Sequence, residues 1–217
     1  MFLGTKIWVA VLVTVTLLGV VNGLTPSEKS ALTDLQAQWG EKLGWSTPVE
    51  SACSPSGAWR GLLCYNDSVV NMYLGGNGLT GTLPASIGGL SSLQGMGLAF
   101  NALGGTLPPS MGDLKDLNVL ELSSNSLQGQ IPPAVFALPN IARLALDNNF
   151  FTGSLPQQTP SKSLVGLDAY RNLLEGILPD WICGLGEKQF DVSGNAWKCP
   201  EPSCCQNGSN PRCGTCL

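Results

Sequence analysis

The sequence predicts an α/β solenoid of about six stacked coils, with a parallel β-sheet on its concave face. Three observations predict this fold. Asparagines recur at spacings of 24, 24, 24, 23 and 23 residues. Apolar residues alternate just before each asparagine, which is the periodicity of a short strand. A glycine and then Leu-Pro or Ile-Pro follow each of the first five, as in Gly81-Thr82-Leu83-Pro84. The repeated asparagines are Asn77, Asn101, Asn125, Asn149, Asn172 and Asn195.

Each recurring position of the repeat has a physical reason. The asparagine side chain both donates and accepts hydrogen bonds, so stacked coils would align these residues into a ladder that satisfies backbone groups. The glycine permits a tight bend, and the proline holds an extended stretch where no strand-pairing N–H is needed. A single coil cannot bury its apolar face alone, so the coils are expected to share one continuous core.

The N-terminus has the pattern of a secretory signal peptide over residues 1–23. Lys6 precedes an apolar run from Ile7 to Val21, and small and polar residues follow at Asn22 and Gly23. The alternative is an uncleaved membrane anchor, but the run is shorter than the roughly 20 residues that a spanning helix needs. We therefore expect a secreted, extracellular protein whose mature chain has no membrane span.

Residues 24–68 are expected to form a cap on the first coil. Thr25 and Glu28 have the spacing of a capping box, with a proline at the first helical position. Apolar residues then fall on one face of the predicted helix, which would cover the first coil. Tryptophans in this segment are interpreted as structural plugs rather than as ligand-stacking residues. The apolar helix face consists of Ala31, Leu32, Leu35 and Trp39.

The pattern L-x-x-L-x-L-x-x-N-x-L-x-G-x-L/I-P over residues 69–198 resembles the plant-type extracellular leucine-rich repeat. Such repeats form receptor-kinase ectodomains, receptor-like proteins and polygalacturonase-inhibiting proteins. The resemblance implies a right-handed superhelix with a helical N-terminal cap. In that family a tryptophan-glycine segment precedes a cysteine of the cap, as Trp59-Arg60-Gly61 precedes Cys64 here, and this implies that Cys53 pairs with Cys64.

Residues 199–217 are expected to form a disulfide-rich C-terminal cap. An even number of cysteines behind a signal peptide favours disulfides. We predict that Cys183 pairs with Cys199, because both lie at the edge of adjacent coils; the other four cysteines then admit three pairings. A zinc site at Cys213-Gly214-Thr215-Cys216 is the alternative, disfavoured by an oxidising compartment. The cysteines are Cys53, Cys64, Cys183, Cys199, Cys204, Cys205, Cys213 and Cys216.

Composition excludes several classes of function. The formal net charge of −4 argues against a nucleic-acid partner. The chain has no histidine, and so it lacks the commonest general base and metal ligand. We expect no enzyme activity, no cofactor and no metal; paired carboxylates such as Asp147 and Asp168 are better explained as a solvated repeat face. The sequons at Asn66 and Asn207 are candidate glycosylation sites.

The predicted function is recognition of an extracellular protein or peptide through the concave face, in signalling or defence at the cell wall or cell surface. Strand residues between the inward positions point out on this face. The alternatives are an inhibitor of an extracellular hydrolase and a structural wall or matrix protein; ice binding would need a regular threonine row, which is missing. The expected partner-binding residues are Tyr73, Phe100, Glu121, Arg143, Asp168, Tyr170 and Arg171.

Overall fold

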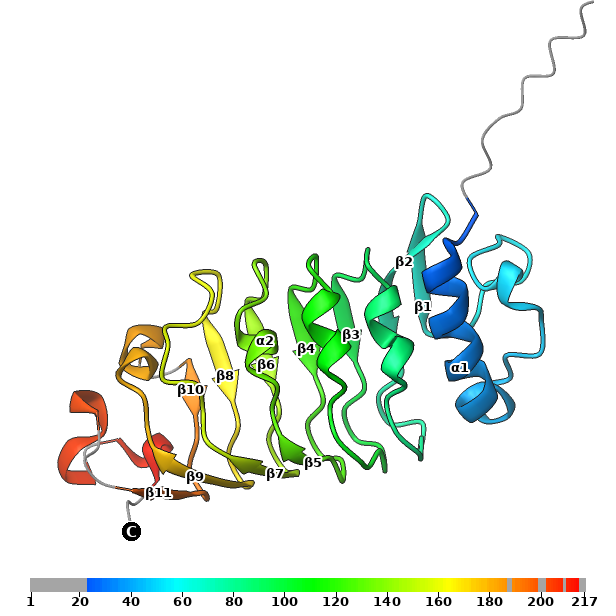
Figure 1. Cartoon of the computed structure of the whole chain (residues 1–217). Helices are drawn as coiled ribbons and strands as arrows, with labels where there is room; N and C mark the ends of the chain where they lie inside the picture. Colours follow the sequence, from blue (N-terminus) through cyan, green and yellow to red (C-terminus); the bar gives the residue numbers. More distant parts are fainter. Residues whose placement is uncertain (1–22, 187–188, 199–201, 209, 215–217) are drawn as a thin grey trace, which may run out of the picture.

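The computed structural model describes residues 23–186, 189–198, 202–208 and 210–214. Apart from Gly23, the expected signal peptide lies outside these residues. The described chain is an elongated stack of coils with a long helix at its N-terminal end (Figure 1). The helices are α1 (Pro26–Leu43) and α2 (Pro133–Phe136), and the 3-10 helices are η1 (Val49–Ser51), η2 (Ala85–Gly89), η3 (Pro109–Asp113), η4 (Asp180–Leu185), η5 (Ser203–Gly208) and η6 (Pro211–Cys213). The strands are β1 (Leu62–Tyr65), β2 (Ser68–Tyr73), β3 (Gly95–Gly97), β4 (Val119–Glu121), β5 (Gln128–Gln130), β6 (Arg143–Ala145), β7 (Phe150–Gly153), β8 (Gly166–Asp168), β9 (Leu173–Ile177), β10 (Phe190–Asp191) and β11 (Ala196–Lys198).

The main sheet contains the strands that precede the repeated asparagines. Its order is β1-β2-β3-β4-β6-β8-β10, and every pair from β2 onward is parallel. In each parallel strand of this sheet, β2, β3, β4, β6, β8 and β10, one residue of a shared register row is buried, so one side of every strand faces the core. This arrangement confirms the predicted parallel sheet. The buried row is Met72, Met96, Leu120, Leu144, Leu167 and Phe190.

The asparagines form the ladder that their spacing predicts. Asn125 shows the arrangement: its Oδ1 accepts from the backbone N–H of Leu103 at 3.1 Å, in the preceding coil. Its Nδ2 donates at 3.0 Å to the carbonyl of Leu98 in that coil and at 3.0 Å to the carbonyl of Leu122 in its own. The same bonds recur at Asn101, Asn149, Asn172 and Asn195. Asn77, in the first coil, instead donates to the carbonyl of Gly75.

A second parallel sheet, which the sequence did not predict, follows the asparagines. It has the order β11-β9-β7-β5 and runs along the lower edge of the stack in Figure 1. From Asn125 onward, the extended segment after each asparagine pairs with the same segment of the next coil, as Gly129 does with Phe151. The earlier coils contribute only an isolated bridge between Thr82 and Gly104.

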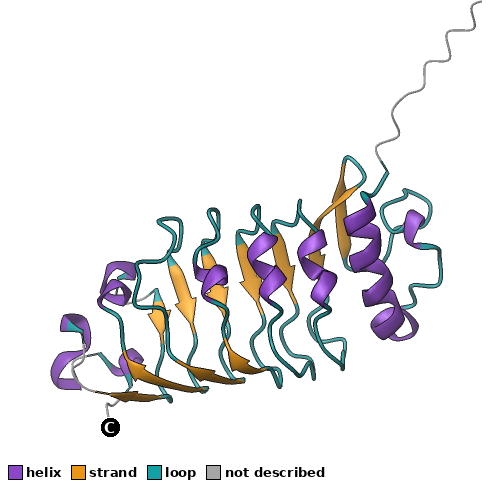
Figure 2. Cartoon of the chain, viewed as in Figure 1, coloured by secondary structure: helices purple, strands orange, loops and turns teal. Residues whose placement is uncertain are grey.

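Short helices cover one side of the main sheet and leave its other side free of helices (Figure 2). They begin after the Leu-Pro or Ile-Pro pairs and pack closely in successive coils. A side chain on Gly88 of η2 would begin 2.3 Å from the carbonyl oxygen of Ser110 in η3. Glycine is therefore required there, because any Cβ would clash with the neighbouring backbone.

At the N-terminal end of the stack, α1 packs against η2 of the first coil. Thr25 and Glu28 form the capping box of α1, and the buried carboxylate of Glu28 also accepts from the backbone N–H of Val69 at 3.3 Å. Trp39 on the buried helix face donates its Nε1 hydrogen to the carbonyl of Thr80 at 2.9 Å. Trp45 and Trp59 stack with ring centroids 4.5 Å apart and are both buried, so they serve as structural plugs.

Disulfides are present at each end of the stack. Cys53 bonds Cys64, as the family resemblance implies. At the other end the predicted pairing of Cys183 with Cys199 is wrong, because Cys183 bonds Cys204. The reason is that η4 packs against η5, which brings position 204 to the edge of the fifth repeat.

The remaining described disulfide joins Cys205 to Cys213, and both residues are buried in the core. Cys204, Cys205 and Cys213 are thus bonded to other cysteines, which removes the thiolates that the zinc alternative requires. Cys199 and Cys216 lie outside the described residues, as does the side chain of the sequon residue Asn207. The sequon residue Asn66 is exposed in the turn between β1 and β2.

Candidate binding face

We call the face of the main sheet away from the short helices the open face. Along each strand the buried residue is flanked by residues that point out on this face. Because the strands are parallel and in register, these residues form straight rows across the sheet. The central row is Tyr73, Gly97, Glu121, Ala145, Asp168 and Asp191.

A groove of about 530 Å³ crosses the C-terminal half of the open face. Its walls come from the strands β4, β6, β8 and β10, from the segments that follow β3, β4, β6 and β8, and from η6 of the C-terminal cap. A smaller hollow of about 330 Å³ adjoins it and shares Arg143, Asp168 and Arg212. The charged and aromatic residues that line the larger groove are Phe100, Glu121, Arg143, Asp147, Asp168, Tyr170, Asp191 and Arg212.

The best-defined interaction in the groove is an ion pair. The Arg143 Nη2 atom donates to the Asp168 Oδ2 atom at 3.1 Å across the neighbouring strands β6 and β8. Burial raises the pKa of Asp168 above its ordinary value of 3.8, and Arg143 offsets part of that rise. The negative charges of the Asp147 and Asp191 carboxylates raise the pKa of Asp168 further.

Asp147 is a buried carboxylate at the base of the groove. Ser123 Oγ and Asn148 Nδ2 both donate to it, the latter at 2.7 Å. Tyr170 lines the same groove, and its pKa is raised above the ordinary value of 10.0 by burial and then by Asp147. Hydrogen bonds therefore fix the position of the carboxylate before any ligand arrives.

The structure brings most of the predicted partner-binding residues together. Phe100, Glu121, Arg143, Asp168 and Tyr170 line one groove. Tyr73 and Arg171, the other two, do not line it.

These two residues lie elsewhere. Tyr73 is on the same face, at the N-terminal side of the groove, with 54% of its surface exposed. Arg171 is exposed at the turn after β8, in a left-handed conformation with a φ of 52°, and its Cγ packs beside Gly194.

Three charged groove residues were not selected from the sequence. Asp147 and Asp191 occupy outward positions in the repeat, so the repeat pattern alone could have found them. Arg212 lies in η6, outside the repeats, and reaches the groove because its carbonyl accepts from the backbone N–H of Val192 at 2.7 Å. The adjacent disulfide of Cys213 fastens this segment. Periodicity carries no signal for such a residue.

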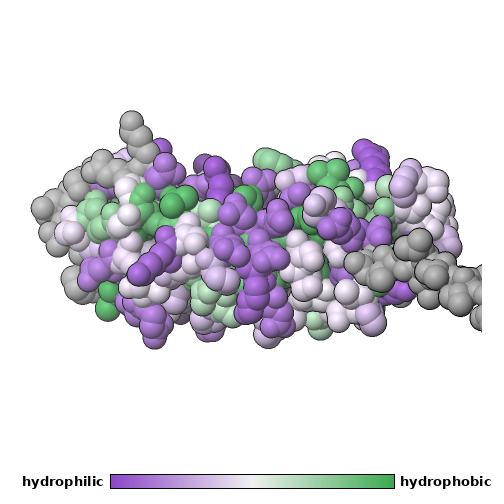
Figure 3. Space-filling view, turned by 90° about the horizontal axis from the view of Figure 1, so that it is seen from above, coloured by the Kyte–Doolittle hydropathy of each residue, from purple (hydrophilic) through white to green (hydrophobic). Residues whose placement is uncertain are grey.

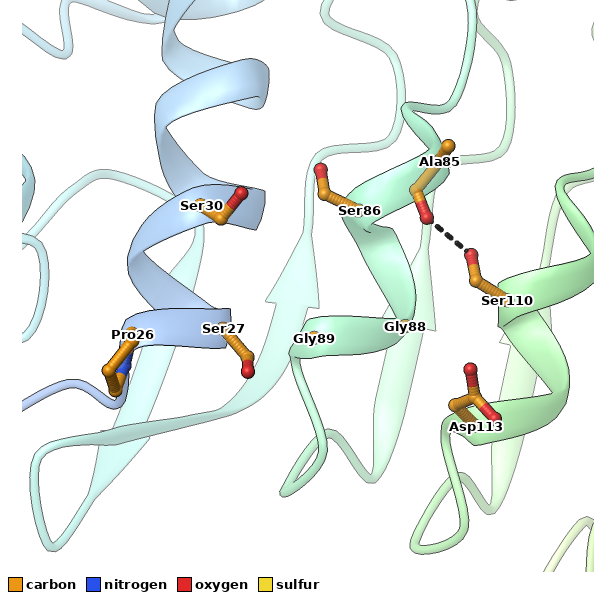
Figure 4. Close-up of a pocket in the computed structure, with 9 residues that line it drawn as sticks. All are labelled: Pro26, Ser27, Ser30, Ala85, Ser86, Gly88, Gly89, Ser110 and Asp113. Atoms are coloured by element: carbon orange, nitrogen blue, oxygen red, sulfur yellow. Dashed lines mark hydrogen bonds between the residues drawn. The ribbon is translucent and has the colours of Figure 1, made fainter.

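A second hollow, of about 560 Å³, lies on the helix side between α1, η2 and η3 (Figure 4). Small residues line it, and the dashed line in Figure 4 is the bond from Ser110 Oγ to the carbonyl of Ala85, at 2.7 Å. Asp113 is the one charged residue among those that line it. The hollow follows from the close approach of glycine-bearing helices and offers few groups that would orient a ligand.

Within the described residues, no group of three or more Cys, Asp or Glu side chains is arranged to hold a metal ion. In the same residues, no helix is both long and apolar enough to cross a membrane. Seen along the upper edge of the stack, the surface is mostly hydrophilic with small apolar patches (Figure 3).

Comparison with known proteins places this geometry in context. The family described as Leucine Rich Repeat matches residues 68–90 and 116–138. The ectodomain of the receptor kinase SOBIR1 from Arabidopsis thaliana is 28% identical, with a TM-score of 0.67, over 80% of this chain and 95% of that one. The BIR2 ectodomain from the same plant is 27% identical, with a TM-score of 0.69, over 81% and 97%.

A chain in the BIR3–SERK2 complex from Arabidopsis thaliana is similar to the same extent. It is 28% identical, with a TM-score of 0.66, over 79% of this chain and 95% of that one. No curated protein sequence matches the chain. This chain is thus similar to the SOBIR1 and BIR2 ectodomains over nearly all of their length.

Proposed function

We propose, from the premise that the chain is a leucine-rich repeat protein of the plant extracellular type, that it is secreted and recognises a protein or peptide through its open face. The groove of about 530 Å³ on that face is the observation that carries the proposal. It combines an aromatic ring, a paired arginine and fixed carboxylates on neighbouring strands. Tyrosine and arginine are enriched among residues that dominate binding energy.

The solved relatives support recognition of a protein partner. One of them is printed as a complex of two proteins, BIR3 and SERK2. Another similar chain comes from a structure described as PEPR1-AtPEP1. We place the present protein in the same role, at the cell wall or cell surface, in signalling or defence.

The groove side chains on and next to β6 and β8 are expected to contribute most to binding. Arg143 and Asp168 are already paired, so a partner that binds there must exchange or extend that ion pair. Tyr170 supplies a rigid ring with a polar tip, which gives contact area at low entropic cost. We therefore expect Arg143→Ala and Tyr170→Ala together to weaken partner binding by at least about tenfold.

Affinity capture with matched variants tests the proposal. The bait is the mature protein, and captured partners are identified by mass spectrometry and measured again as purified proteins. The matched control carries Lys162→Ala and Glu41→Ala, two exposed residues outside the groove. A partner lost by the groove variant and kept by the control supports the proposal. A partner bound equally by all three proteins would contradict it.

A further inference from the structure

Tyr73 lies over a strand that has no side chains on the open face. Its register partner across the sheet is Gly97 of β3, and Gly95 of the same strand pairs with Asn71. The Tyr73 hydroxyl oxygen is 3.1 Å from the point where a Gly95 side chain would begin, and its Cδ1 atom is 3.0 Å from the same point at Gly97. The ring therefore runs along β3, and both glycines beneath it are buried.

A hydrogen bond holds the ring in this place. The Tyr73 hydroxyl lies 3.2 Å from the Oδ1 atom of Asn71, two residues earlier on the same strand. Although the ring covers β3, more than half of the Tyr73 surface remains exposed. One side of the ring thus rests on the sheet while other parts face solvent, and little conformational entropy remains to be lost on binding.

Glu121 is the charged residue next to this ring. It follows Gly97 in the central row, and its Oε2 atom is 3.7 Å from the Gly97 point that the ring also approaches. Within the described residues Glu121 has no ion pair and its side chain makes no hydrogen bond, unlike Asp168, which Arg143 neutralises. An unpaired carboxylate therefore stands beside an exposed aromatic ring.

This combination attracts a cation from two directions. The face of an aromatic ring draws cations through its quadrupole, and a carboxylate draws them through its charge. Arginine meets both demands, because its planar guanidinium stacks on a ring and donates in a fork to a carboxylate. Phe100, which lines the groove with Glu121 and is 71% exposed, offers an apolar surface for the methylene stem.

We infer that Tyr73 and Glu121 form a subsite for an arginine side chain of the partner, an inference that rests on the proposed function of the open face. The net charge of −4 favours a cationic partner over an anionic one. A sugar ring could also stack on tyrosine, but β3 provides no side chains that would donate to its hydroxyl groups. Arginine is therefore the occupant that the charges favour.

Tyrosine ring resonances report the subsite directly. The chain has three tyrosines, at positions 65, 73 and 170, so NMR signals of ring-labelled protein are assigned with single Tyr→Phe variants. The probe is the peptide acetyl-Gly-Arg-Gly-amide, and the control is the same peptide with uncharged citrulline. We expect saturable shifts at Tyr73 with the arginine peptide, at least about threefold weaker binding of the citrulline peptide, and no response at Tyr65.

Two variants separate the subsite from general changes. Glu121→Gln removes the charge at constant size and is expected to weaken the arginine peptide about threefold to fivefold. Gly97→Ala places a methyl group 3.0 Å from Tyr73 Cδ1 and should displace the ring, with a similar loss. Gly104→Ala is the matched control, because its nearest neighbour is 3.8 Å away, and its affinity should stay unchanged.

Three results would overturn the inference. They are equal shifts with the arginine and citrulline peptides, an unchanged affinity in Glu121→Gln, and a Tyr73 response to the neutral tetrasaccharide cellotetraose but not to arginine. The proposed function is judged separately. If Arg143 and Tyr170 variants abolish partner binding while Glu121→Gln binds the partner normally, the open face is the binding surface but the arginine subsite is wrong. If the arginine peptide binds but no open-face variant affects the partner, the proposed function fails, and with it the partner's use of the subsite, although the affinity of Tyr73 and Glu121 for arginine is established.

Discussion

Removing one amide from the asparagine ladder should destabilise the whole stack. Asn125→Ala is the chosen change, because Asn125 is 8% exposed and its side chain makes three bonds of 3.0–3.1 Å to backbone groups of two coils. The Leu103 N–H has no other acceptor within the described residues, so the variant leaves a buried donor unpaired. The carbonyls of Leu98 and Leu122 each keep one bond, from Asn101 and Asn149 respectively.

The expected loss follows from these three groups. An orphaned buried N–H costs about 1–3 kcal/mol, and each lost bond at a carbonyl that keeps another partner costs about 0.5–1 kcal/mol. The total is about 2–5 kcal/mol, which for a chain of this size corresponds to a fall of roughly 4–20 °C in Tm. Asn77→Ala is the matched control, since the Asn77 side chain donates only within its own coil, to the carbonyl of Gly75 at 3.0 Å, and its loss should cost about 1 kcal/mol.

Urea unfolding followed by circular dichroism, with the disulfides intact, measures both variants against the parent. A third variant, Asn125→Asp, keeps an acceptor for the Leu103 N–H but turns a carboxylate oxygen toward two carbonyls. It should be less stable than the parent at neutral pH and recover as the carboxylate protonates. The reasoning is refuted if Asn125→Ala and Asn77→Ala lose the same free energy of unfolding within about 0.5 kcal/mol.

Two further predictions concern the helix side and the groove. Gly88→Ala would place a Cβ 2.3 Å from the carbonyl oxygen of Ser110 and should cost about 1–3 kcal/mol in unfolding measurements, whereas Gly184→Ala, with no atom within 4 Å, should be neutral within about 0.5 kcal/mol. Arg143→Gln should raise the pKa of Asp168 further, because the cation that lowers it is gone; a carboxyl 13C titration that shows a fall would contradict this. Since the folded-state pKa of Asp168 lies above 3.8, this group favours the folded state at acidic pH, and that contribution is lost as pH rises through the raised pKa.

The repeats were predictable because their spacing sets the register of the sheet. Once Asn101 and Asn125 align, their preceding residues must also align, and Gly97 indeed pairs with Glu121. The outward rows follow from strand alternation, which is why most of the selected binding residues lie in one groove. The second sheet was not predictable, because its strands need the segments after the asparagines to come into contact, and no alternation marks β5 or its neighbours.

The C-terminal cap shows where sequence reasoning fails. Cys199 is closer to Cys183 in sequence than Cys204 is, yet the packing of η4 on η5 brings Cys204 into place. Without hydrophobic periodicity, the path of this segment depends on its disulfides and on single contacts such as that of Arg212 with Val192. Neither has a pattern that a sequence can display.

The cap also ties the end of the stack to the binding face. A solenoid must cover the last coil, and here η6 does so with the buried Cys213 while it extends Arg212 into the groove. The N-terminal side of the open face, by contrast, holds Tyr73 on a glycine strand. Under the proposed function, recognition is therefore divided between an aromatic, anionic subsite that the repeats build and a charged end that the cap completes. Changes in the cap would therefore alter the charged end of the face without moving the subsite of Tyr73 and Glu121.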